Sequence, residues 1–118
     1  MSVLLNYYRA LEVFRSRDDL IPVQRVATFL LVAMRGKVTR EDVADALGQS
    51  STSAYRNLMA LSEGPYRLNA ARKEGMGLLQ VREDEYETRR LVWTLSAKGQ
   101  RLKTQIEELL TNDTKRTA

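Results

Sequence analysis

Residues 38–53 read VTREDVADALGQSSTS, and this stretch decides the fold. Thr39 is typical of a helix N-cap, because the two acidic residues that follow fall in the first turn, where the helix dipole favours negative charge. Gly48 ends this short helix, and Ser50 is placed to cap the next one. The pattern therefore predicts two helices joined by a tight turn, which is a helix-turn-helix unit.

The second helix of this unit, Ser50 to Leu61, carries no acidic side chain, although 29% of the chain is charged. When its apolar residues face the core, a step of about 100° per residue turns Thr52 and Arg56 outward. Arginine can bind a guanine edge as a fork, and Ser or Thr hydroxyls reach phosphates and base edges. We therefore predict a recognition helix for the DNA major groove. The alternative is an ordinary solvated helix face, although such faces usually carry pairs of Glu and Lys.

Apolar periodicity predicts three more helices around this unit. The first covers Val3 to Phe14. The second begins at Pro22, which suits the first turn of a helix, and ends at Gly36. The last begins after Ser96, which is placed as its N-cap, and its polar end is expected to fray.

The segment between the recognition helix and the last helix changes its pattern. Residues 62–77 are irregular, and Pro65 and Gly75 mark the ends of a predicted short helix. Apolar residues then alternate around 79–81 and again over 91–95, which predicts two strands joined by a polar turn at 84–88. This hairpin would be the wing that follows a helix-turn-helix unit.

The predicted fold is mainly α with a small β-hairpin. It is a winged helix-turn-helix in the order of four helices, a short helix, two strands and a final helix. We expect a single domain over residues 1–118. Within it, residues 1–17 and 97–112 would form outer helices, residues 21–96 a DNA-binding core, and residues 113–118 a frayed tail.

Composition excludes most catalytic chemistry. The chain has no cysteine and no histidine, which removes thiolate sites, the usual metal ligands and the usual general base at neutral pH. It also lacks the glycine-rich motifs that cradle nucleotides. We therefore expect no enzyme and no cofactor. The net charge of +4 suits a polyanionic partner, and the absence of a long apolar run or a leader pattern predicts a cytoplasmic protein with no membrane partner.

Three stretches resemble the MarR family of bacterial winged-helix transcription regulators. Residues 21–24 (IPVQ) resemble the family's "LTPxQ", residues 38–53 resemble "LTxxELAxxLGxSxST", and residues 91–99 (LVWTLSAKG) resemble the "xLTxKG" that follows the wing. The resemblance implies a homodimer that binds a pseudo-palindromic operator, with the outer helices forming the dimer interface. It also implies that Arg89 matches the wing arginine that reaches the minor groove.

The chain departs from the family in two places. Residues 62–77 exceed the usual link between recognition helix and wing, and their cations Arg67, Arg72 and Lys73 either add phosphate contacts or belong to a solvated insertion. The wing turn carries clustered carboxylates, which would repel phosphates, so DNA contacts are expected at the base of the hairpin. The predicted DNA-binding residues are Ser50, Ser51, Thr52, Ser53, Tyr55, Arg56, Arg72, Lys73, Arg82, Arg89 and Arg90.

The outer helices carry apolar stripes that exceed what a small core needs. These stripes pack either within one chain or between two chains, because an exposed stripe would need a partner. The predicted dimer-interface residues are Leu4, Tyr7, Tyr8, Leu11, Phe14, Leu102, Ile106, Leu109 and Leu110. Nothing in the sequence supports a small-molecule effector.

The leading hypothesis is a dimeric, sequence-specific transcription regulator that binds double-stranded DNA. The runner-up is a winged-helix protein–protein module, such as a viral or plasmid accessory factor, and the acidic wing turn with Tyr86 is its best motive. A replication or recombination factor is a third hypothesis, because fold alone does not separate these functions.

Overall fold

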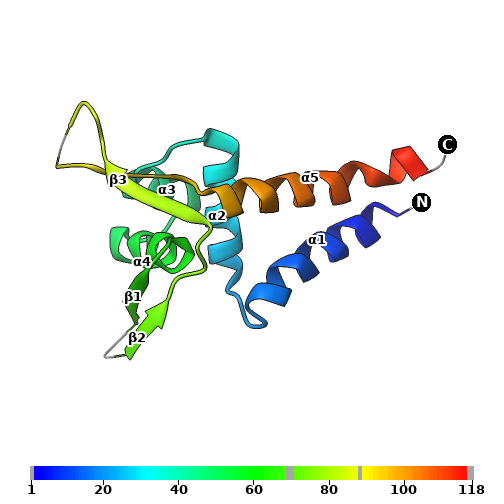
Figure 1. Ribbon diagram of the computed structural model, residues 1–118, viewed down its shortest axis with the longest axis horizontal. Helices are drawn as coiled ribbons and strands as arrows, with labels where there is room; N and C mark the ends of the chain where they lie inside the picture. The colour runs from blue at the N-terminus through cyan, green and yellow to red at the C-terminus, as the bar shows by residue number, and fades with distance from the viewer. Residues whose placement is uncertain (1, 69–70, 88, 117–118) are drawn as a thin grey trace.

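Two outer helices and an α/β body make up the molecule (Figure 1). The computed structural model describes residues 2–68, 71–87 and 89–116. The elements are α1 (Val3–Arg17), α2 (Val23–Arg35), α3 (Arg40–Leu47), α4 (Ser51–Leu61), β1 (Pro65–Leu68), β2 (Ala71–Glu74), β3 (Leu79–Glu83), β4 (Leu91–Leu95) and α5 (Ala97–Arg116). Helices α1 and α5 run side by side and extend away from the rest (Figure 1). Within the described ranges, no helix has both the length and the apolar character that a membrane crossing needs.

The helix-turn-helix unit begins and ends where its capping residues predict. The Thr39 hydroxyl accepts a hydrogen bond from the Asp42 backbone N–H at 3.1 Å, and the Asp42 carboxylate accepts one from the Thr39 N–H at 2.8 Å. This reciprocal pair is a capping box. Gly48 ends α3 in the left-handed conformation, at φ 62°. Ser50 caps α4 by accepting from the Ser53 N–H at 3.1 Å, so the predicted recognition helix is present.

The short helix predicted between Pro65 and Gly75 is wrong. This segment forms an antiparallel hairpin instead, in which β1 pairs with β2 and Pro65 lies opposite Glu74. The reason is non-local. The Gly75 N–H donates to the Gly64 carbonyl at 2.9 Å, so the chain must leave and return to the same point. A helix over the ten residues between these glycines would carry the chain about 15 Å away.

The predicted wing is present as a separate two-stranded sheet. Strands β3 and β4 are antiparallel, with Leu79 opposite Leu95 and Glu83 opposite Leu91. Trp93 also exchanges two backbone hydrogen bonds with Val38, which precedes α3, at 2.8 and 3.0 Å. The base of the wing is therefore joined to the helix-turn-helix unit.

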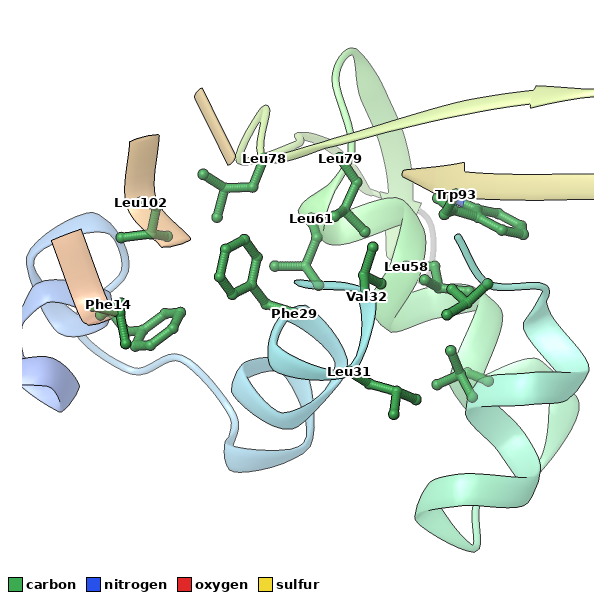
Figure 2. Packing of buried hydrophobic residues seen from close by; sticks show 14 of the residues in the cluster. Phe14, Phe29, Leu31, Val32, Leu58, Leu61, Leu78, Leu79, Trp93 and Leu102 are labelled. Atoms are coloured by element: carbon green, nitrogen blue, oxygen red, sulfur yellow. The ribbon is translucent and has the colours of Figure 1, made fainter. Parts of the chain in front are cut away.

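The core lies where α2, α4 and the wing meet (Figure 2). Phe29 of α2, Leu58 and Leu61 of α4, and Leu79 and Trp93 of the wing are all fully buried. Phe14 extends this core to the outer helices, since its ring contacts Phe29 edge-on with the ring centroids 5.6 Å apart. The outer helices are thus packed on the body through the same core.

Helix α5 is longer than predicted. It continues to Arg116, whereas the sequence pattern predicted a frayed tail from residue 113. No glycine or proline interrupts residues 111–116, and the Thr111 hydroxyl donates to the Glu107 carbonyl one turn earlier at 2.9 Å. Polar composition alone therefore does not end this helix.

Candidate nucleic-acid interface

Helix α4 presents a small polar face to solvent, as its periodicity predicts. Ser51, Thr52 and Arg56 are exposed, while Ala54 and Leu58 are completely buried on the opposite side. Among the residues that the structure describes, Arg56 has no carboxylate within ion-pair distance. Its guanidinium is therefore available to a ligand.

Some of the hydroxyls at the start of α4 make hydrogen bonds within the helix itself. The Ser50 hydroxyl donates to the Ser53 hydroxyl at 3.1 Å while it caps the helix. Ser53 is half-buried. Thr52 and the neighbouring Ser51 thus remain the more accessible hydroxyls on this face.

Tyr55 connects α4 to its neighbours. Its ring meets the Trp93 ring edge-on, with centroids 6.1 Å apart and planes at 82°. On the other side, the Arg40 guanidinium carbon lies 4.8 Å from the centroid of the Tyr55 ring. A cation over an aromatic face is attracted by the ring quadrupole. Tyr55, which the sequence placed at the edge of the DNA face, therefore also fixes α4 against α3 and the wing.

A buried polar contact, which the sequence pattern did not predict, joins α4 to α2 on the side away from the exposed face. Asn57 of α4 is only 7% exposed, and its side-chain oxygen accepts a hydrogen bond from Arg25 Nε of α2 at 3.2 Å. Asp18 lies 4.0 Å from the same guanidinium. The only sequence signal was an arginine beside the apolar stripe of α2. This bond holds α4 against α2, because loss of either partner leaves a buried polar group unpaired.

The wing turn neutralises part of its own negative charge. Asp84 is 4% exposed and pairs with Arg90 at 2.9 Å, and Glu87 lies 3.6 Å from the same guanidinium. The Asp84 N–H also donates to the Arg90 carbonyl at 2.8 Å, which closes the hairpin. Thr88, at the end of the predicted turn, lies outside the described residues. Arg90 is therefore occupied within the wing.

Arg82 and Arg89 are exposed, as is the paired Arg90. Neither Arg82 nor Arg89 has an ion-pair partner in the described part of the chain. Arg89 lines an open cleft of about 290 Å³ between the base of the wing and the helix-turn-helix unit, and Arg40, Tyr55 and the carboxylates of Glu41 and Glu87 line it too. Side chains of both signs from the wing and from α3 thus border the same cleft beside α4.

Strands β1 and β2 hold the remaining predicted contacts. Arg72 and Lys73 lie in β2, and Arg67 lies opposite Arg72 in β1. The hairpin follows directly on the C-terminal end of α4, so it lies next to that helix (Figure 1).

The predicted dimer residues divide into two groups. Phe14, Leu102 and Ile106 are at most 5% exposed and belong to the core of the single chain. Leu109 is half-buried. The others leave an apolar surface on α1 and the adjoining part of α5, made of Leu4, Tyr7, Tyr8, Leu11 and Leu110, which are 81, 68, 59, 45 and 44% exposed. We call these five residues the outer apolar face.

Superposition on solved structures supports the fold. No family model matches the sequence, and none of the curated proteins matches it significantly. Among solved structures, RV1404 from Mycobacterium tuberculosis superposes with a TM-score of 0.68 at 17% identity, covering 96% of this chain and 69% of that one. E. coli MarR, as a mutant complexed with operator DNA, gives 0.63 at 15% identity, covering 94% and 70%. A mutant of S. aureus MepR bound to an oligodeoxyribonucleotide gives 0.63 at 15% identity, covering 94% and 74%.

The chain has a MarR-like winged-helix fold. In this fold, α3 and α4 are the helix-turn-helix unit, β3 and β4 are the wing, and α1 and α5 are the outer helices. The identities are low, so the likeness establishes the fold, and DNA is a ligand of those solved complexes.

Proposed function

We propose that this chain is a cytoplasmic, sequence-specific transcription regulator without enzyme activity, which binds double-stranded DNA as a homodimer. Helix α4 would enter the major groove with Ser51, Thr52 and Arg56 toward the bases. The observation that carries this proposal is the acid-free, exposed face of α4 with an unpaired arginine at its centre. Two structures with the same fold, those of MarR and MepR, are complexes with DNA.

The remaining DNA contacts would come from around α4. Ser50 and Ser53 lie at the helix N-terminus, where backbone N–H groups favour a phosphate. Tyr55 lies at the border of the face. Arg82 and Arg89 are exposed cations of the wing with no ion pair among the described residues, and the exposed Arg90 would add to their positive field from its ion pair. These contacts would position α4, while α4 reads sequence.

Arg56→Ala should weaken binding to the preferred operator by about 1–3 kcal/mol and relax its specificity, because a bidentate contact to a base would be lost. The operator is first selected from genomic fragments with the purified protein, and affinities are then measured by fluorescence anisotropy. Arg101→Ala is the matched control, because it removes one exposed cation from α5, away from α4. If Arg56→Ala binds every duplex as tightly as the wild type, α4 is not the recognition helix.

The homodimer would form through the outer apolar face. Large apolar patches that stay exposed on a single chain mark sites of association. In addition, Tyr7, Leu11 and Leu110 border a mostly apolar hollow of about 150 Å³ that continues inward to Phe14 and Ile106. A second copy of the face can fill such a hollow in a symmetric, self-complementary contact.

The double variant Leu4→Glu, Tyr8→Glu should be monomeric in analytical ultracentrifugation, whereas the wild type should sediment as a dimer. Both side chains are exposed in the single chain, so the thermal melt should change little. Leu20→Glu is the control, because Leu20 is 86% exposed but lies outside the outer apolar face. A wild type that stays monomeric, or a double variant that still dimerises, would reject this interface.

A second candidate function is docking on a protein partner through the wing tip. Tyr86 is 86% exposed there, beside the exposed carboxylates of Glu83 and Glu85. An aromatic ring among carboxylates suits a basic protein surface better than a phosphate backbone. This candidate is favoured if the wild type binds no duplex even at about 50 mM salt, where non-specific DNA affinity is high.

A further inference from the structure

The β1–β2 hairpin lies directly after the recognition helix. It forms a sheet of its own, separate from the wing. In Figure 1 it leaves the end of α4 on one side, while β3 and β4 extend on the other side, and both hairpins project away from the ends of the outer helices. Helix α4 is thus flanked by two hairpins.

Backbone contacts fix this hairpin to the recognition helix. The Gly75 N–H donates to the Gly64 carbonyl at 2.9 Å, and the Met76 N–H donates to the Ala60 carbonyl in the last turn of α4 at 2.9 Å. A Cβ atom at Gly75 would lie 1.9 Å from the Ser62 carbonyl oxygen, so only glycine permits this approach. The base of the hairpin therefore moves with the C-terminal end of α4.

The hairpin has a clear excess of positive charge in its sequence. Its two strands contain three cations, Arg67, Arg72 and Lys73, and a single acidic residue, Glu74 at the base. Arg67 and Arg72 are direct register partners, so the basic positions fall together in one short hairpin. A two-stranded hairpin is only marginally stable by itself, which favours a role in which a ligand contacts it.

The recognition helix needs positive charge from neighbouring elements to neutralise phosphates. Phosphate neutralisation supplies most of the sequence-independent affinity for DNA. Helix α4 contains one cation, Arg56, and the wing combines its arginines with four carboxylates, at positions 83, 84, 85 and 87. The hairpin, in contrast, has a clear excess of positive charge at the other end of α4.

We propose that the β1–β2 hairpin is a second DNA-binding wing, which neutralises backbone phosphates of the duplex through Arg67, Arg72 and Lys73. This inference rests on the proposed function, because it requires α4 to be docked in the major groove. The β3–β4 wing then lies along one side of the bound groove and the second wing along the other. The second wing contributes affinity for any duplex rather than preference for a sequence.

The salt dependence of binding tests the second wing. The logarithm of the binding constant falls with the logarithm of salt concentration, with a slope of about −0.9 for each neutralised phosphate. In the full chain, Arg67→Gln, Arg72→Gln, Lys73→Gln should make this slope shallower by about 2 to 3 per bound chain. The control Arg9→Gln, Arg101→Gln, Lys103→Gln removes equal charge from α1 and α5 and should leave the slope close to that of the wild type.

Further variants separate charge from structure. Arg67→Lys, Arg72→Lys keeps the charge and should keep the wild-type slope. The Gln variant should melt close to the wild-type temperature, so that a changed slope reports the lost charge and not a loss of folding. A Gln variant with the same slope as its control overturns the second wing, even where Arg56→Ala loses specificity and the proposed function stands. A wild type that binds no duplex overturns both.

Discussion

Replacement of Trp93 by alanine should lower the free energy of unfolding by about 3–5 kcal/mol, which is a large part of the stability of a small domain. The Trp93 side chain is completely buried between the wing and the helix-turn-helix unit, and its ring contacts Tyr55 edge-on. Alanine would leave a cavity where α4, the wing and the segment before α3 meet (Figure 2). Urea unfolding followed by circular dichroism measures the loss.

Trp93→Phe is the informative control for this prediction. The indole Nε1 is buried and has no hydrogen-bond partner among the described residues, so phenylalanine removes an unsatisfied donor while it keeps an aromatic ring. We expect it to cost clearly less than alanine does, because the smaller ring leaves a smaller cavity than loss of the whole ring system. A cost equal to that of alanine would mean that Nε1 has a partner, such as water, and that the ring itself contributes little.

The parts of the fold that local rules determine could be predicted from sequence. The capping box at Thr39, the turn at Gly48 and the cap at Ser50 each depend on neighbours within a few residues. The β1–β2 hairpin could not be predicted in this way. Its strands exist because Gly75 returns to Gly64 and to the end of α4, and that contact has no local signature. Proline and glycine at the two ends suit a helix and a hairpin equally well.

The candidate site likewise contains features that local rules predict and features that depend on tertiary packing. The exposure of Thr52 and Arg56 follows from helical periodicity once the buried side is known, and the structure agrees. The Arg25–Asn57 bond and the Asp84–Arg90 pair join residues whose approach depends on tertiary packing or on the register of the wing. Charge counting alone therefore treats Arg90 as a free cation, whereas the structure pairs it.

The apolar stripes of the outer helices show a further limit of periodicity. The spacing identifies one continuous stripe on α1, but the side of α1 that is buried carries Asn6, Ala10 and Phe14, so Phe14 is the stripe residue that joins the core. Leu4 and Tyr8 lie at the other edge of the stripe and stay exposed. Which part of a stripe belongs to the core thus depends on the side from which the neighbouring helix packs, and that is a property of the assembled fold.

Gly99→Ala should be nearly as damaging as loss of the tryptophan, at about 3 kcal/mol. Gly99 lies in the first turn of α5, in the stretch that resembles the family's "xLTxKG". A Cβ atom there would lie 2.0 Å from the backbone oxygen of Leu78. That oxygen cannot move away without loss of a hydrogen bond, because it accepts one from the Ser96 N–H at 3.0 Å. The start of α5 must therefore separate from the chain that leads into β3.

Gly48→Ala separates this clash from ordinary backbone strain. Gly48 has a left-handed φ of 62°, but nothing lies within 4 Å of the place where its Cβ would be. Alanine there should cost only about 1–2 kcal/mol, the usual strain of that conformation. Urea unfolding of both variants makes the comparison, and equal losses would show that α5 adjusts to the added methyl group.

Because Leu78 directly precedes β3, displacement at Gly99 should also move the wing. Gly99→Ala should therefore weaken DNA binding even in the fraction that remains folded, whereas Trp93→Phe should not.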